Sequence, residues 1–277
     1  MKTKACSLII LLITLAIGIP GETPEELILQ GDAFYTQRQD PAQAAQALAK
    51  YQEALKMSPH SYEAMVKNAQ ASYFIGDNAV SNDEKQKIFK GGMELAKKMI
   101  ALRPGRVEGH YWLGVHMGSY GEARGVLKSL FLKNDIIDAM KKAIAIDGAY
   151  ESGGAYCVLG RLYYKVPGLF GGSNKKSRQN LETCREIAPK SSINLIFLAE
   201  TYWALGEKKM AIQALEDLQA MEADPLWIPE TENDKKAGAK LLKKYKTIKQ
   251  VINSNLEELK KEIGKKSEIF RLLDEEY

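Results

Sequence analysis

Residues 110–114 read HYWLG, and this short stretch decides the fold. In helix-turn-helix repeats of about 34 residues, a small residue near position 8 lets the first helix approach the second, and Gly114 stands there. Small residues near positions 20 and 27 keep the second helix close, and a proline near position 32 ends it. If Gly114 belongs to such a repeat, related units should lie before and after it.

The same pattern recurs four more times along the chain. Its small positions are filled by Gly31, Ala47, Ala54, Ala69, Gly92, Ala96, Ala143, Gly160, Ala199 and Ala211. The first four units close at Pro59, Pro104, Gly148 and Pro189. These five occurrences of the pattern predict an all-α protein. Residues 22–224 should form a solenoid of about five degenerate tetratricopeptide-type (TPR) helix pairs.

The repeats are interrupted between their paired helices. Excess residues lie around 40–43, at 78–87 and at 122–133, and a glycine-rich turn occupies 167–173. We expect residues 78–87 to separate two helices as an insertion, residues 122–133 to form an extra amphipathic segment, and Ser173 to cap the helix after it. Functional residues are expected beside the interruptions at 78–87, 122–133 and 167–173.

The glycine-rich turn also invites comparison with a phosphate-binding loop. Residues 168–177 precede a predicted helix and contain Lys175, Lys176 and Ser177. The P-loop pattern requires a glycine directly before its lysine and hydroxyl residue, but Lys175 stands in that place and no apolar strand precedes the segment. A tight turn is therefore the better interpretation.

The N-terminus carries a targeting signal. Two lysines precede an apolar run over residues 5–19, and Ala16 with Gly18 forms a small-x-small cleavage pattern. Residues 1–21 predict a secretory signal peptide and thus an exported, periplasmic protein; the alternative is an uncleaved membrane anchor through residues 5–19. Because Cys6 stands before the apolar run and not after it, a lipid anchor is not expected.

Removal of this segment leaves Cys157 and Cys184, which the repeat alignment places on the two antiparallel helices of one pair. In an exported chain they could form a disulfide or remain two buried thiols, and both alternatives are open. The histidines His60, His110 and His116 have neither i,i+4 spacing nor a cysteine nearby in sequence. No metal site and no cofactor are therefore predicted.

The chain changes character after Pro225. Residues 225–277 are charged and amphipathic, and one face of the predicted helix carries Leu241, Tyr245, Ile248 and Ile252. We expect this segment to cap the exposed apolar end of the array. Residues 235–249 contain seven lysines and no acidic residue, which suits either a solvated capping face or contact with an anionic surface.

Composition and charge exclude several classes of protein. A content of 45% hydrophobic and 27% charged residues is typical of a folded soluble domain. The net charge of +4 falls to about +2 without Lys2 and Lys4, so no nucleic-acid partner is predicted. Carboxylate pairs such as Glu257-Glu258 lie in the solvated tail, and no serine lies in a nucleophile elbow, so the chain is not expected to be an enzyme.

The concave wall of the solenoid, lined by the first helix of each repeat, is the candidate site. The inward-facing positions are Tyr35, Tyr73, Phe74, Tyr111, Arg161, Tyr164 and Trp203. An aromatic wall suits a partly apolar ligand or a partner helix, and Arg161 could pair one anionic group. The alternative is that most of these aromatic side chains pack between adjacent repeats.

Four blocks of the sequence resemble a known family. Residues 110–114, 138–144, 159–164 and 168–173 together resemble the TatT-component proteins, which are periplasmic helical-repeat partners of TRAP-type transporters. The same blocks are similar to the eukaryotic regulator of microtubule dynamics family. The likeness covers about residues 60–220 and implies a protein partner, such as the solute-binding component of a transporter.

Two functions follow from these observations. The first is a periplasmic scaffold or accessory protein that binds a protein partner, or an apolar or anionic small ligand, on its concave face. The second is an assembly protein whose repeats form a homo-oligomer without a ligand. Contact with a membrane is expected only through proximity to it or through an uncleaved N-terminal anchor.

Overall fold

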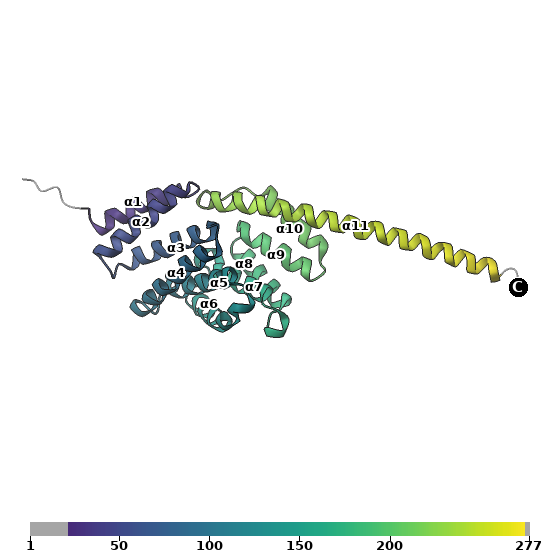
Figure 1. Cartoon of the computed structure of the whole chain (residues 1–277), viewed down its shortest axis with the longest axis horizontal. Coiled ribbons are helices and arrows are strands. Elements are labelled where there is room, and N and C mark those ends of the chain that lie inside the picture. Colours follow the sequence, from purple (N-terminus) through teal and green to yellow (C-terminus); the bar gives the residue numbers. More distant parts are fainter. Residues whose placement is uncertain (1–21, 275–277) are drawn as a thin grey trace, which may run out of the picture.

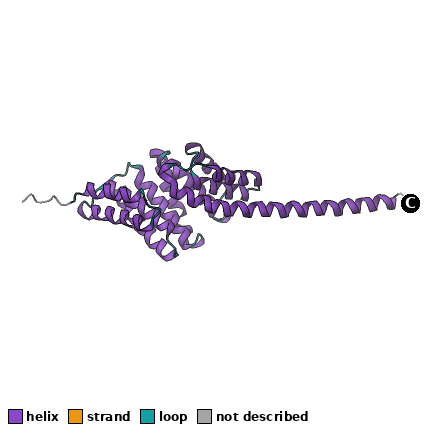
Figure 2. Ribbon diagram, turned by 90° about the horizontal axis from the view of Figure 1, so that it is seen from above, coloured by secondary structure: helices purple, strands orange, loops and turns teal. Residues whose placement is uncertain are grey.

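The computed structural model describes residues 22–274, with side chains as far as Ile263. The signal peptide predicted for residues 1–21 lies outside the described residues. Within the described part every regular element is helical, as Figure 2 shows, which confirms the all-α prediction. The α-helices are α1 (Pro24–Tyr35), α2 (Pro41–Met57), α3 (Tyr62–Asn78), α4 (Asn82–Leu102), α5 (Val107–Arg124), α6 (Lys133–Asp147), α7 (Tyr150–Lys165), α8 (Asn174–Ile187), α9 (Ser192–Ala204), α10 (Lys208–Ala220) and α11 (Ile228–Asp274). Short 3-10 helices are η1 (Leu127–Leu132), η2 (Gly168–Phe170) and η3 (Pro225–Trp227).

The first ten α-helices pack as consecutive pairs, α1 with α2 through to α9 with α10, in the manner of a TPR solenoid (Figure 1). Local sequence determines where several of them begin. The hydroxyls of Ser61, Ser81 and Ser173 accept hydrogen bonds from backbone N–H groups in the first turns of α3, α4 and α8. The predicted cap at Ser173 is thus confirmed.

Small residues allow the paired helices to approach. Ala47, Ala69 and Ala96 are completely buried at predicted close-contact positions. A Cβ atom added to Gly160 of α7 would lie 2.5 Å from the side chain of Leu181 on α8, which is closer than van der Waals contact allows. The small-residue pattern in the sequence therefore reflects close helix–helix packing.

Two predicted interruptions take a different form. Residues 78–87 do not form an insertion between helices, because Ser81 caps α4 early and only residues 79–81 link the helices. Most of the excess sequence lengthens α4, whose first turns bury Phe89. Of residues 122–133, the first three extend α5, and most of the rest forms the 3-10 helix η1, so the segment is not one amphipathic helix.

The helix α11 caps the array with its first half only. Tyr245 stacks on Trp203 of α9, with ring centroids 3.8 Å apart and planes at 10°, and Lys246 pairs with Glu216 of α10 at 2.7 Å. Ile252, predicted on the capping face, is 52% exposed, since the helix has by then projected beyond the solenoid (Figure 1). Within residues 22–274, no helix combines the length and apolar character needed to cross a membrane.

Candidate functional site

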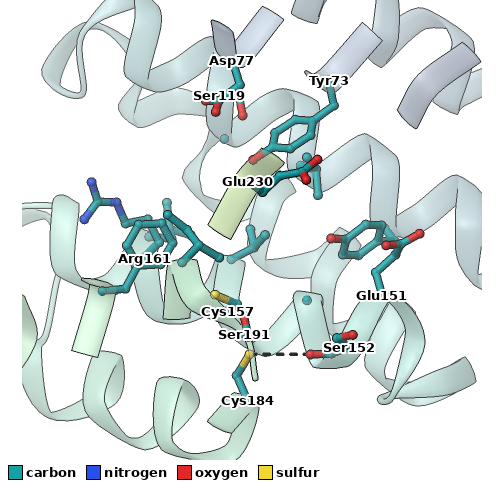
Figure 3. A pocket seen from close by; sticks show the side chains of 18 of the residues that line it. Tyr73, Asp77, Ser119, Glu151, Ser152, Cys157, Arg161, Cys184, Ser191 and Glu230 are labelled. Atoms are coloured by element: carbon teal, nitrogen blue, oxygen red, sulfur yellow. Dashed lines mark hydrogen bonds between the residues drawn. The ribbon is translucent and has the colours of Figure 1, made fainter. Parts of the chain in front are cut away.

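A cavity of about 740 Å³ occupies the concave face of the solenoid (Figure 3). Side chains of α1, α3, α5, α7 and α9 line it, together with η1, η3, parts of α6 and α8 and the beginning of α11. Its aromatic wall comprises Tyr35, Tyr73, Phe74, Tyr111, Trp112, Phe197 and Trp227. The volume lies within the range of about 300–1,000 Å³ that is usual for small-molecule sites.

One ion pair beside the cavity joins the first helix pair to α11. Arg38, which follows α1, donates hydrogen bonds to both carboxylate oxygens of Glu230 on α11, at 2.8 and 2.7 Å, and to the carbonyl of Leu226. The Arg38 side chain is only 6% exposed, and its guanidinium lies 4.8 Å from the ring centroid of Tyr35 and 5.8 Å from that of Trp227. We call this Arg38–Glu230 contact the clasp.

Four carboxyl groups of the cavity wall have no ion-pair partner among the described residues. Asp224 caps η3 by accepting a hydrogen bond from the backbone N–H of Leu226. The other three are Asp77 at the end of α3, Glu151 at the start of α7 and Asp234 on α11. Burial raises the pKa of each above its usual range, and that of Asp234 to about 6. Asp77 is exposed to solvent, but partial desolvation by the surrounding protein still raises the pKa of this carboxyl.

The raised pKa of Asp234 predicts a pH-dependent stability. Between the usual value of 3.8 and about 6, the folded state binds more protons at this group than the unfolded state, so stability falls as pH rises through this window. Asp234→Asn should therefore increase the free energy of unfolding by about 1–2 kcal/mol at pH 7.5, and by much less at pH 4.5. Thermal unfolding at the two pH values checks this, and an equal gain at both would contradict it.

The start of α7 has an unusual backbone at the cavity wall. Glu151 and Ser152 adopt left-handed conformations, with φ of 47° and 57°, before Gly153 at 71°. Non-glycine residues rarely adopt this region, and they do so mostly where the surrounding structure holds them. The turn directs the carbonyl of Ser152 toward Cys184, whose thiol donates to it at 3.8 Å.

The two cysteines are free, buried thiols on α7 and α8, so the structure has no disulfide between them. Both line the cavity (Figure 3). The neighbouring Cys184 thiol and burial raise the pKa of Cys157 well above its usual range. Cys157 is therefore a neutral thiol at pH 7.

The structure brings five of the seven predicted site residues to the cavity wall: Tyr35, Tyr73, Phe74, Tyr111 and Arg161. Trp203 is outside it because Tyr245 of α11 stacks on its ring. Tyr164 is also outside the wall, and its ring centroid lies 5.7 Å from the guanidinium of Arg161. The prediction from repeat positions took the concave face to be open. In the structure, α11 covers part of that face.

Arg161 is not free to pair an anionic ligand. Its guanidinium contacts Glu122 of α5 at 3.2 Å and also pairs with Glu200 of α9. The guanidinium carbon also lies 4.3 Å from the ring centroid of Phe197, which adds a cation–π contact. Arg161 therefore links neighbouring helices of the array.

Sequence reasoning missed Arg38, Glu230, Asp77, Glu151 and Asp234. Asp77 lies just before the segment 78–87, so proximity to that interruption was a usable signal for this residue. Among the described residues, no group of three or more His, Cys, Asp or Glu side chains is arranged to hold a metal ion.

Comparisons with known proteins agree with this architecture. The TPR protein TTC0263 of Thermus thermophilus is similar in structure, with a TM-score of 0.59 and 17% identity over 79% of this chain and 99% of that one. PilF of Pseudomonas aeruginosa is similar with a TM-score of 0.50 and 16% identity, over 80% of this chain and 90% of its own. Among curated proteins, none is similar enough in sequence to match the chain.

A family model gives the sequence relationship. The model described as regulator of microtubule dynamics protein 1-3 matches residues 27–171, which is more than half of the 277 residues. The match spans the clasp residue Arg38, the cavity residues Asp77 and Glu151, and the HYWLG stretch that defines the repeat. The chain belongs to the regulator of microtubule dynamics protein 1-3 family.

Proposed function

We propose that this protein is a non-enzymatic TPR-type binding protein that holds a partly apolar small molecule in its concave cavity. The observation that carries this proposal is a cavity of about 740 Å³ with an aromatic wall, one of whose residues, Glu230, belongs to the clasp. A helix from a partner protein would need an open groove, but η3 and the start of α11 occupy part of that face. A small molecule therefore suits the cavity better than a partner helix.

We further propose that the protein works in the periplasm as a scaffold or accessory of a partner protein, such as the solute-binding component of a TRAP-type transporter. Support comes from the apolar segment at residues 5–19 and from the resemblance of four sequence blocks to the TatT-component proteins. Copurification from the native host, followed by protein mass spectrometry, tests this. Failure to enrich any transporter component over an empty-bait control would contradict it.

Cavity filling tests the small-molecule function. Gly118 of α5 lines the cavity, and a Cβ added there meets no atom within 4 Å. Gly118→Phe should therefore fold normally while its ring occupies the cavity. We expect the protein to copurify with a small molecule that native mass spectrometry detects, and the variant to lose it.

A matched control is available on α4. A Cβ added to Gly91 also meets no atom within 4 Å, but this glycine is exposed and does not line the cavity. Gly91→Phe should keep the ligand. Equal occupancy in the two variants, or no bound molecule in the parent protein, would overturn the proposed function.

The distal part of α11 favours a second candidate, self-assembly. Its exposed apolar residues are Val251, Ile252, Leu256, Leu259 and Ile263, between 49% and 66% exposed. Most of them recur every three or four residues and so share one helix face. Light scattering of the full chain and of a chain ending at Lys249 tests this; a full chain that is monomeric at all concentrations would exclude self-assembly.

A further inference from the structure

We propose that the ligand of the cavity is an organic cation, whose ammonium group is attracted by the wall carboxyl groups of Asp77, Glu151 and Asp234 and whose apolar body lies against the aromatic wall. This inference rests on the proposed function and specifies the chemical class of its ligand. It reverses the charge that the sequence alone predicts for the ligand, because Arg161 is already paired.

The three carboxyl groups come from separate elements of the array. Asp77 ends α3, Glu151 begins α7 and Asp234 lies on α11, and all three line the cavity. Figure 3 shows Asp77 and Glu151 on different sides of the site. The hydroxyl of Ser192 donates a hydrogen bond to Asp234 at 2.7 Å. Because a hydroxyl is neutral, this bond does not neutralise the charge of the carboxylate. Wall carboxylates without ion-pair partners favour a positive charge in the cavity that they line.

Nearby lysines are engaged elsewhere. Lys85 and Lys67 are the cations that act on Asp77 and Glu151, yet neither lines the cavity. Lys85 donates to the backbone carbonyl of Asp77, and Lys67 pairs with Asp32 at 2.9 Å. Neither lysine therefore neutralises the carboxyl groups by direct contact.

The basic residues of the wall itself also leave these carboxyl groups unpaired. Lys133 donates to the carbonyl of Phe170 at 2.8 Å, and Arg161 pairs with its two glutamates. Lys165 lies at the end of α7, and Lys190 is exposed in the loop between α8 and α9. None of these four makes an ion pair with the three carboxyl groups within the described residues.

The remaining wall offers further contacts for an ammonium group. Tyr73 and Tyr111 line the cavity and provide aromatic rings, to which organic cations bind through cation–π contacts. Trp112 lies between them, with its ring centroid 6.0 Å from that of Tyr73 and 5.1 Å from that of Tyr111. Ser129, a wall residue only 7% exposed, has a hydroxyl without a hydrogen-bond partner in the described structure. An unsatisfied buried hydroxyl is an independent sign of a missing polar partner.

The test compares three probes that share one chain length. Octyltrimethylammonium, octanoate and 1-octanol differ mainly in head-group charge, and Trp112 and Trp227 in the cavity wall provide a fluorescence signal beside calorimetry. At pH 7.5 and low salt, the cation should bind at least about tenfold more tightly than octanoate. The variant Asp77→Asn/Glu151→Gln/Asp234→Asn should lose this preference.

A matched control removes the same number of charges elsewhere. Glu232, Glu257 and Glu258 are exposed on α11 and do not line the cavity, so their replacement by glutamine should leave the preference unchanged. The single variant Asp234→Asn, which should be at least as stable as the parent, serves if the triple variant does not fold, and should weaken binding of the cation several-fold.

The outcomes separate the two proposals. If octanoate or 1-octanol binds as tightly as the cation, the inference about charge is overturned while the small-molecule function stands. If the cation preference survives in the cavity variants, the assignment of these carboxyl groups is overturned. If none of the three probes binds and no molecule copurifies with the protein, the proposed function itself fails.

Discussion

Gly92→Ala is expected to lower the free energy of unfolding by about 2–3 kcal/mol. A Cβ atom at Gly92 of α4 would lie 2.4 Å from the ring of His116 on α5. That ring is completely buried and is surrounded by Tyr73, Phe89 and Trp112, with centroids 6.0–6.4 Å away. Since His116 has no space into which to move, the helices must separate.

The adjacent glycine is a control for this variant. No atom lies within 4 Å of a Cβ at Gly91, which is exposed in the interior of α4. Gly91→Ala should stabilise the protein by up to about 1 kcal/mol, because alanine favours the helix more than glycine does. Urea denaturation measures both changes. Similar stability of the two variants would show that close packing of α4 against α5 does not determine the stability of the solenoid.

Replacing Arg38 by methionine is the second change with a large expected effect. Methionine keeps an unbranched apolar stem but leaves Glu230, whose side chain is 27% exposed, without its partner. We expect a loss of about 2–3 kcal/mol in the free energy of unfolding. We also expect faster amide hydrogen exchange in residues 225–234, because the clasp attaches this segment to the first helix pair.

A surface arginine provides the comparison for Arg38→Met. Arg178 pairs with Glu182 and Glu207 at 2.8 Å, but its side chain is 38% exposed. Arg178→Met should cost less than about 1 kcal/mol, since exposed ion pairs contribute little. Equal effects of the two substitutions, with unchanged hydrogen exchange in residues 225–234, would contradict a structural role for the clasp.

The sequence predicts the repeats well because their signal is local. Gly114, Ala69 and Ala96 recur at the spacing of helix pairs, and each sits where helices touch. Ser173 could be identified as a cap from its position before a helix, for the same reason. Features determined by neighbours along the chain were therefore predictable.

The cavity was only partly predictable because the residues around it are far apart along the chain. Arg38 and Glu230 are 192 positions apart, and no repeat pattern connects the two. The path of α11 across the concave face places Tyr245 on Trp203, which removes Trp203 from the site. The role of Arg161 likewise changed because Glu122 and Glu200 approach it from other helices.

The proposed function requires that the concave cavity is a ligand site. Titration calorimetry with octyltrimethylammonium, applied to the parent protein and to Gly118→Phe, tests it most directly. The structure predicts saturable binding of one cation per chain in the parent protein and its loss when the new ring fills the cavity. Equal binding by the two proteins would place the ligand elsewhere and contradict the claim.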